Sequence, residues 1–383
     1  MNREPSTEQP GGPSTSLTPR MKRRLAFWTF ACLVLFMAGG AGGLLLYAAH
    51  SLQPTEPGEP VRFTIPKGVS STRIASILER NGLIRDATTF AYYLKLKDIG
   101  RGFQAGEYEI APGTAISRII DMLNNGETVP PEMIRFTIPE GWTVEQIAAQ
   151  VAEAAGLDRE AILELARHPE KLTAPEGKAM PAFVGQLADR EGLVYKLEGY
   201  LFPETYEMPA DSTANDIVFR LVRELGDRLA RLPEGWESRL QETGLSFHEL
   251  LTVASLIERE VVLDEERPIV ASVIYNRLAK KMNLEIDATV QYALGEHKER
   301  LLHEDLKVDS PYNTYRHAGL PPGPIASPGL KSIEAALYPA ETDYLFYVTK
   351  KDGSGGHLFA ETYNGHLRNI EISNQTARNA GDR

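Results

Sequence analysis

The longest apolar run in the chain lies close to its N-terminus. Leu25 to Ala49 contains 25 residues without a charge, and as a helix it would be roughly 37 Å long, against about 30 Å for the hydrocarbon core of a bilayer. Four basic residues fall within positions 20–24, whereas the first charges after the run are acidic. We therefore expect a transmembrane helix at 25–49 and a cytoplasmic tail at 1–24. A cleaved signal peptide is the alternative, but its apolar core would be only about 7–15 residues long.

The polar pattern changes sharply after this run. Three prolines between Gln53 and Pro60 predict a short stiff spacer at 50–60. Val61-Arg-Phe-Thr-Ile-Pro-Lys-Gly then reads as a strand that ends in a glycine turn, and the segment from Ser71 has the apolar spacing of an amphipathic helix. Further helices and a strand at Gly106-Glu-Tyr-Glu-Ile follow, so we expect a small α+β unit at 61–128.

One pattern occurs twice. Phe63-Thr-Ile-Pro-Lys-Gly recurs 73 positions later as Phe136-Thr-Ile-Pro-Glu-Gly. A single pair of copies indicates a duplicated strand-turn-helix rather than a solenoid, which needs at least three repeats. From here to the C-terminus the spacing is mainly helical, with a β-hairpin predicted near His357, so residues 129–383 are expected to form a larger, mostly helical α+β domain.

Composition excludes several classes of function. The net charge is -11, and because residues 1–24 carry +3, the remainder carries -14, which argues against a nucleic-acid partner. The one cysteine, Cys32, lies inside the apolar run, so it can be neither a nucleophile nor half of a disulfide in the domain beyond. No zinc, serine-hydrolase or phosphate-binding motif is present. We expect no metal and no cofactor.

Glu258 is the leading candidate for chemistry. Ser246-Phe-His-Glu249 is a capping box, and the helix that it starts has an apolar face on whose shoulder Glu258 lies, while Glu260 falls about 160° around the helix. Loss of water would raise the pKa of a carboxyl there and suit it to donate a proton at neutral pH. A buried ion pair is the alternative for Glu258, and spacing does not decide between the two.

Two later segments carry weaker signals. Asp287 fits the N-cap of a short helix. The long segment from Ser310 to Gly329 contains five prolines and few charges, and loops of this length inside a domain are often functional. Tyr312, Asn313 and Tyr315 suit contacts with sugar faces and N-acetyl groups, although a structural brace fits the composition equally well.

Five ordered motifs together resemble those of the endolytic murein transglycosylase (YceG-like) family. They are Glu198-Gly-Tyr-Leu-Phe-Pro-Glu-Thr-Tyr206, Ala254-Ser-Leu-Ile-Glu-Arg-Glu260, Asp287-Ala-Thr-Val-Gln-Tyr292, Ser310-Pro-Tyr-Asn-Thr-Tyr315 and Gly319-Leu-Pro-Pro-Gly-Pro-Ile-Ala-Ser-Pro-Gly329. The resemblance implies a single-pass protein of the bacterial inner membrane that cuts nascent peptidoglycan strands internally and limits their length, beside penicillin-binding synthases. It also implies a LysM-like glycan-binding module at 61–128 and a catalytic domain at 129–383 outside the cytoplasm.

The same resemblance implies the reaction and its residues. Glu258 matches the family's catalytic acid, which would first protonate the bond between N-acetylmuramic acid and N-acetylglucosamine and then act as base, leaving a 1,6-anhydro end. No second catalytic carboxylate is then required, in contrast to ordinary glycosidases. A hydrolytic muramidase and a non-enzymatic peptidoglycan-binding scaffold are the alternatives. The positions expected to contact substrate are Glu198, Tyr200, Gln291, Tyr312, Asn313 and Tyr315.

Overall fold

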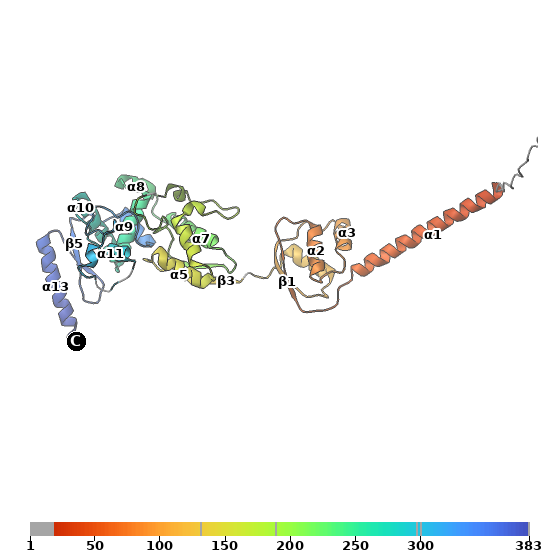
Figure 1. Cartoon of the computed structure of the whole chain (residues 1–383), viewed down its shortest axis with the longest axis horizontal. Helices are drawn as coiled ribbons and strands as arrows, with labels where there is room; N and C mark the ends of the chain where they lie inside the picture. The colour runs from red at the N-terminus through yellow and green to blue at the C-terminus, as the bar shows by residue number, and fades with distance from the viewer. Residues whose placement is uncertain (1–18, 131, 188–189, 296–297, 299–300, 382–383) are drawn as a thin grey trace, which may run out of the picture. The chain divides into compact units, whose positions relative to one another are not determined.

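The chain folds into two compact units that follow an N-terminal helix. The computed structural model describes residues 19–130, 132–187, 190–295, 298 and 301–381 (Figure 1). One unit extends to residue 131 and the other begins at Glu132. Helices predominate, and the described strands form three separate antiparallel pairs, so the fold belongs to the predicted α+β class.

Helix α1, Pro19–Ser51, contains the predicted apolar span and is longer than it at both ends. Phe27–Ser51 is long and apolar enough to cross a membrane, and none of its most apolar stretch is buried in the protein. Such a helix fits a membrane anchor, because exposed apolar side chains of this number need a partner other than water.

The first unit is a two-stranded sheet with helices packed on it. Its elements are β1 (Val61–Ile65), α2 (Ser71–Arg80), α3 (Ala87–Lys97), β2 (Gly106–Ile110) and α4 (Ile116–Asn125). Strands β1 and β2 run antiparallel, and alternate residues of each point into one apolar core shared with the helices.

The second unit holds the remaining elements. Its strands are β3 (Met133–Thr137), β4 (Thr205–Pro209), β5 (Phe346–Thr349) and β6 (His357–Ala360). Its α-helices are α5 (Val144–Ala155), α6 (Arg159–Arg167), α7 (Ala214–Leu229), α8 (Trp236–Thr243), α9 (Phe247–Glu260), α10 (Arg267–Ala279), α11 (Asp287–Leu294), α12 (Leu330–Leu337) and α13 (Tyr363–Gly381). Four short 3-10 helices are described: Pro169–Lys171, Ala182–Gln186, Asp264–Glu266 and Asp305–Lys307. The predicted hairpin is the β5–β6 pair.

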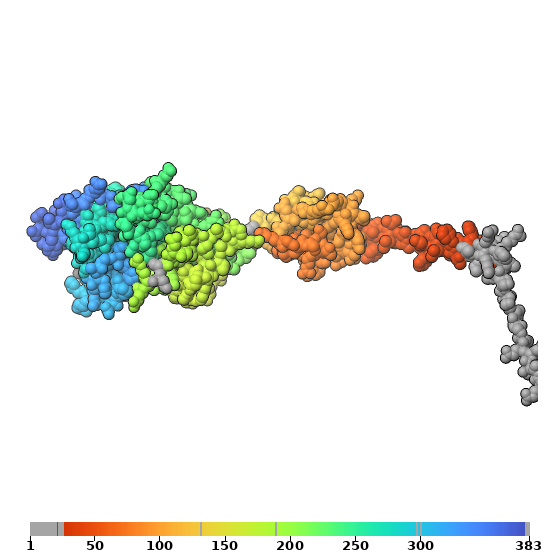
Figure 2. All heavy atoms as spheres, turned by 90° about the horizontal axis from the view of Figure 1, so that it is seen from above, coloured from red at the N-terminus to blue at the C-terminus, as the bar shows by residue number. Residues whose placement is uncertain are grey.

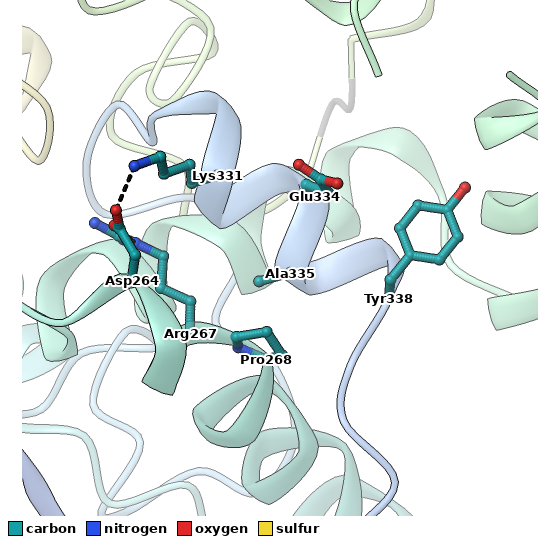
Figure 3. A pocket seen from close by; sticks show the side chains of 7 residues that line it. All are labelled: Asp264, Arg267, Pro268, Lys331, Glu334, Ala335 and Tyr338. Atoms are coloured by element: carbon teal, nitrogen blue, oxygen red, sulfur yellow. Dashed lines mark hydrogen bonds and ion pairs between the residues drawn. The ribbon is translucent and has the colours of Figure 1, made fainter. Parts of the chain in front are cut away.

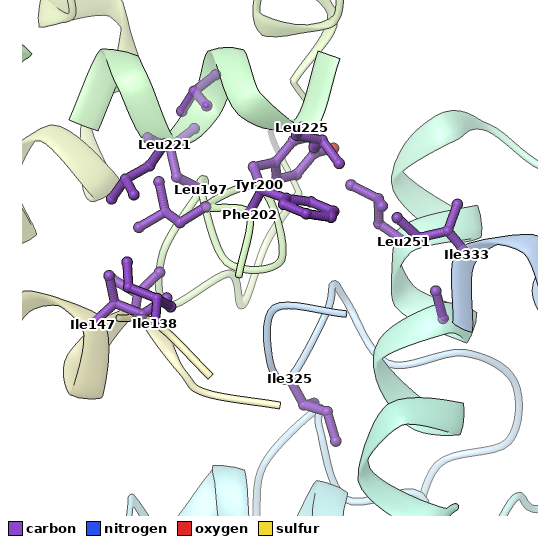
Figure 4. Close-up of a cluster of buried hydrophobic side chains, with 14 of the residues drawn as sticks. Ile138, Ile147, Leu197, Tyr200, Phe202, Leu221, Leu225, Leu251, Ile325 and Ile333 are labelled. Atoms are coloured by element: carbon purple, nitrogen blue, oxygen red, sulfur yellow. The ribbon is translucent and has the colours of Figure 1, made fainter. Parts of the chain in front are cut away.

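Helix α9 lies at the centre of the second unit and packs against α10, α11 and α12. In the core, Leu225 of α7, Tyr200, Leu251 of α9 and Ile333 of α12 meet although they are far apart in sequence (Figure 4). The part of the chain from Glu132 onward, yellow-green to blue, accordingly forms one continuous body (Figure 2). Helix α9 is therefore held in place by three neighbouring helices.

The duplicated sequence pattern forms the same local structure in both units. In the first, Phe63 pairs with Tyr108 across the strands and the two rings stack with centroids 6.0 Å apart. In the second, Phe136 pairs with Tyr206 and the centroids lie 5.6 Å apart. Each tyrosine hydroxyl donates to the carbonyl four residues before it. The copies thus share a strand pair, an aromatic stack and a turn that leads into a helix.

Candidate active site

Helix α9 directs its last two glutamates to different neighbours. Ser246 caps the helix with the reciprocal Ser246–Glu249 hydrogen bonds that the sequence predicts. Glu258 and Glu260 are two positions apart, which separates their side chains by about 160° around the helix. Glu258 faces α12 and α10, whereas Glu260 faces strand β5. Each glutamate therefore has its own environment.

The carboxylate of Glu258 is enclosed by donors. One oxygen accepts the Gly329 N–H at 2.9 Å and the Ser332 hydroxyl at 2.8 Å, and the other lies 3.3 Å from the Arg267 guanidinium. Only 6% of the side chain is exposed. The group sits at the N-terminus of α12, where the helix dipole favours a negative charge. This is the buried ion pair that the sequence left open as the alternative for Glu258.

Glu140 is a second carboxyl in this region, and our sequence analysis did not single it out. Its carboxyl packs so closely on Gly329 that a Cβ at that glycine would be 1.9 Å from Oε1. Loss of water, followed by the nearby charge of Glu258, raises the pKa of Glu140. The only sequence signal is the repeat itself, because Glu140 replaces Lys67 of the first copy.

Beyond Arg267 the surface is hollowed into a cavity of about 220 Å³. Figure 3 shows Asp264 beside Lys331, with which it forms an ion pair, and Arg267 also pairs with Asp264 at 3.1 Å. These three opposite charges compensate one another, and Glu334 is a further charged residue of this lining.

Glu260 occupies a less polar position. The Tyr347 hydroxyl donates to Glu260 Oε2 at 2.9 Å, and burial, with a smaller effect of Asp287, raises the pKa of Glu260. Asp287 in turn accepts the Tyr315 hydroxyl at 2.5 Å. A carboxyl whose pKa is raised retains its proton at higher pH, as a general acid requires.

A cavity of about 460 Å³ is lined by sequence neighbours of these two acids, although neither acid is itself part of the lining. Arg259 and Ala288, the sequence neighbours of Glu260 and Asp287, both line it. The rest of the described lining includes aromatic and amide side chains suited to a saccharide: Trp142, Thr143, Glu145, Gln146, Val194, Tyr195, Gln291, Tyr292, Gly295 and Ile325. Among the described residues, no cluster of three His, Cys, Asp or Glu side chains could hold a metal ion.

The turn of the second copy forms one edge of this cavity. Gly141 N–H donates to the Ser327 carbonyl at 2.9 Å, and Ser327 N–H donates to the Trp142 carbonyl at 2.8 Å. Arg259 Nη1 donates to the Gly141 carbonyl at 3.0 Å. The turn, the proline-rich segment and the end of α9 are therefore fastened together.

Four of the residues expected to contact substrate lie inside the domain instead. Glu198, Tyr200, Tyr312 and Asn313 are each at most 1% exposed. Their side chains point into the interior in this structure, so their contact with a substrate stays a prediction. Long-range packing, which composition does not reveal, turned these side chains inward.

Their contacts show what they do instead. Burial raises the pKa of Glu198 to about 8, and its two oxygens accept the Val144 N–H at the start of α5 and the Tyr292 hydroxyl, each at 3.0 Å. Asn313 donates to the carbonyls of Leu306 and Val308, both at 2.9 Å. Glu198 therefore supports Tyr292, which lines the larger cavity. Asn313 fits the structural brace that was the alternative for the proline-rich segment.

The remaining candidates are accessible. Gln291 lines the larger cavity, and Tyr315 is half-buried beside Asp287. The expectation that Asp287 caps α11 is wrong: the N-cap is Ile286, and the Asp287 side chain makes no capping bond. The Asp287 carboxylate instead accepts a hydrogen bond from the Tyr315 hydroxyl.

The fold and the site first define a class, that of α+β proteins with an apolar N-terminal helix and two glutamates at the end of a central helix. Residues 63–372 match the YceG-like family, so the chain belongs to it, and the resemblance stated from the motifs is confirmed. The proteins named endolytic murein transglycosylase from Bacillus subtilis (strain 168) and Streptococcus pneumoniae are similar to this chain. The first is 39% identical over 85% of this chain and 88% of its own length.

The Streptococcus pneumoniae protein is 31% identical over 88% of this chain, which spans only 63% of that longer relative. A crystal structure of a yceG-like protein from Listeria monocytogenes superposes with a TM-score of 0.55 at 35% identity, covering 81% of this chain and 99% of the other. Relatives of this similarity share the fold of most of the chain.

Proposed function

We propose that this protein is an endolytic murein transglycosylase, which cleaves glycan strands of peptidoglycan between N-acetylmuramic acid and N-acetylglucosamine. The names of the two similar proteins support this reaction. The main structural support is the carboxyl of Glu260, whose pKa burial raises, on the same helix that supplies Arg259 to the lining of a cavity with aromatic and amide walls.

The reaction needs one group that first gives and then takes a proton. As acid, it protonates the oxygen of the glycosidic bond, which breaks at C1 of the muramoyl residue. As carboxylate, it then removes the proton of the C6 hydroxyl of that residue, and the C6 oxygen bonds to C1 to close a 1,6-anhydro ring. No water is consumed, so a single carboxyl suffices.

The family resemblance assigns this role to Glu258, whereas the contacts of the two glutamates favour Glu260. Both oxygens of Glu258 are already occupied by Arg267, Ser332 and the Gly329 N–H. Among the described residues, Glu260 accepts one hydrogen bond, from Tyr347, and its pKa is raised. We therefore assign proton transfer to Glu260 and assign Glu258 to holding α12 against α9.

Two matched variants test the assignment. Purified full-length protein in detergent is incubated with glycan strands, and the new ends are analysed by mass spectrometry. Glu260→Gln should lower the rate by at least about a hundredfold, the usual contribution of a general acid. Glu258→Gln should lower thermal stability but leave folded protein active. An inactive, folded Glu258→Gln beside an active Glu260→Gln would return the role to Glu258.

The same assay separates the alternatives. Anhydro ends support the transglycosylase, whereas reducing ends, heavier by one water, would identify a hydrolytic muramidase. If wild-type protein produces no new ends but binds strands, the protein is a non-enzymatic scaffold.

We further propose the location and the role of the first unit. The basic residues before α1 and the acidic region after it support an inner-membrane protein with its N-terminus in the cytoplasm. The antiparallel β1–β2 pair with α2 and α3 between the strands in sequence supports a LysM-like module that holds glycan. Protease added to spheroplasts should remove both units; protection of them would contradict this topology. Nearby penicillin-binding synthases remain a proposed partner.

A further inference from the structure

The larger cavity contains a cation, Arg259, that forms no ion pair with any described acid. Arg259 lines it, and within the described part of the chain its one hydrogen bond goes to the Gly141 carbonyl, with no carboxylate within ion-pair distance. Glu145, the described acid of the lining, is already bound by Arg159 and by the Tyr195 hydroxyl. The charge of Arg259 is thus available to a ligand.

The Arg259 guanidinium is also held in place. Its five N–H groups are fixed in one plane, and the bond from Nη1 to Gly141 uses only one of them. The remaining donors match the two oxygens of a carboxylate, which arginine binds in a bidentate manner. Trp142 and Tyr292 add aromatic surface to the same cavity, as expected for a saccharide that carries an acid.

We propose that Arg259 binds a carboxylate of the murein strand and so makes the larger cavity selective for muramoyl saccharides over uncharged N-acetylglucosamine polymers. The inference rests on the proposed function, because it names the substrate feature that this site reads. Two parts of a murein strand carry such a group: the lactyl ether when no peptide is attached to it, and the stem peptide when one is.

A second effect of Arg259 has to be separated from binding. Its positive charge also lowers the pKa of the neighbouring Glu260, although burial of that carboxyl outweighs it. A substitution at Arg259 therefore acts on the rate through Glu260 as well. Binding is measured with saccharides that contain no bond for the enzyme to break.

The test is isothermal titration of full-length wild-type protein, Arg259→Gln and Arg259→Lys. The probes are N,N′-diacetylchitobiose, the disaccharide of N-acetylglucosamine and N-acetylmuramic acid, and the same disaccharide with its stem peptide. Arg259→Gln should lower the affinity for the acidic probes about ten- to a hundredfold, as loss of a charged hydrogen bond does. Its affinity for chitobiose should change less than about twofold. Arg259→Lys should restore part of the difference.

Arg239 supplies the matched control. Like Arg259 it donates to a backbone carbonyl, that of Leu337 at 3.0 Å, but it pairs with Glu242 and does not line the cavity. Arg239→Gln should leave the preference for acidic probes unchanged. Equal weakening of chitobiose and the acidic probes by Arg259→Gln, or no weakening of either, overturns the proposal.

The probes also identify the carboxylate, and the outcome is independent of catalysis. If Arg259→Gln loses affinity only for the peptide-bearing probe, the carboxylate belongs to the stem peptide. If it loses affinity for the peptide-free disaccharide, the carboxylate is that of the lactyl group. If wild-type protein cleaves strands but shows no dependence on Arg259, the inference fails and the proposed function stands. If the dependence is seen without cleavage, the cavity is a binding site and the proposed reaction fails.

Discussion

The two copies of the strand-turn-helix differ in what packs on their turns. In the first, Lys67 is exposed and nothing lies within 4 Å of where a side chain on Gly68 would be. In the second, the equivalent Gly141 lies against Arg259 and Glu258. The strand, the aromatic stack and the turn are alike. The difference teaches that the local pattern specifies a scaffold, while the partners of the turn determine its use.

The largest effect should come from removing the aromatic stack. Tyr108→Ala and Tyr206→Ala each delete a buried ring and should cost their own unit about 3–5 kcal/mol. Tyr206→Ala should therefore abolish strand cleavage, whereas Tyr108→Ala should lower the melting temperature of the first unit and leave cleavage by the second. Calorimetry and the strand assay measure both. A lower melting temperature of the second unit in Tyr108→Ala would show that the units do not fold separately.

The pH dependence of stability should also differ between the copies. Helix α5 is capped by Thr143 and by buried Glu198, whose pKa is about 8, whereas α2 is capped by Ser70 alone at its N-cap. The folded state keeps a proton that the unfolded state loses above about pH 4.5. Stability of the second unit should thus fall, by a few kcal/mol at about 1.4 kcal/mol per pKa unit, as the pH rises to about 8.

Glu198→Gln removes this titration and should flatten the decline, which urea unfolding at pH 5 and pH 8.5 would measure. An unchanged slope in the variant would mean that Glu198 is ionised in the folded protein.

Exchanging the turn residues should give a smaller, asymmetric effect. Glu140→Lys places a cation beside Arg267 and Lys331 and removes the carboxyl that packs on Gly329. We expect a loss of about 1–2 kcal/mol and slower cleavage. The reverse exchange, Lys67→Glu, is at an exposed position and should stay within about 0.5 kcal/mol. Equal effects on the two melting temperatures would contradict the comparison.

The smallest difference is expected at the glycines themselves. Gly68 and Gly141 have nearly the same positive φ, 75° and 76°, so alanine should cost each unit a similar amount, about 1–2 kcal/mol. A methyl group at Gly141 would contact Arg259 at 3.7 Å without a clash. Stability should therefore change alike in Gly68→Ala and Gly141→Ala, and only the second should alter the binding of acidic saccharides.

Local signals in the sequence were enough for much of the fold. The uncharged run predicted α1, the capping box predicted the start of α9, and the strand-like segments on either side of the Gly-rich turn before His357 predicted the β5–β6 pair. Each depends on residues a few positions apart. The opposite directions of Glu258 and Glu260 also followed from helical geometry alone.

The surroundings of those glutamates did not follow, because they depend on residues distant in sequence. Gly329 is 71 positions from Glu258, and Gly141 is 118 positions from Arg259. Composition made Tyr312 and Asn313 equally suitable for a sugar or for the interior, and only packing placed them inside. The pairing of Asp287 with Tyr315 likewise joins two segments that the sequence does not connect.

The bonds between Ser327 and the Gly141–Trp142 turn have a consequence for biogenesis. A ribosome makes the chain from its N-terminus, and domains fold as their segments become available. The turn cannot form its hydrogen bonds until Ser327 has been synthesised, and Glu258 at the end of α9 cannot form its own until Gly329 and Ser332 have been synthesised. A polypeptide halted before these positions would lack the contacts that hold the turn and the end of α9. An enzyme that cleaves the cell wall would therefore become active only when its synthesis was nearly complete.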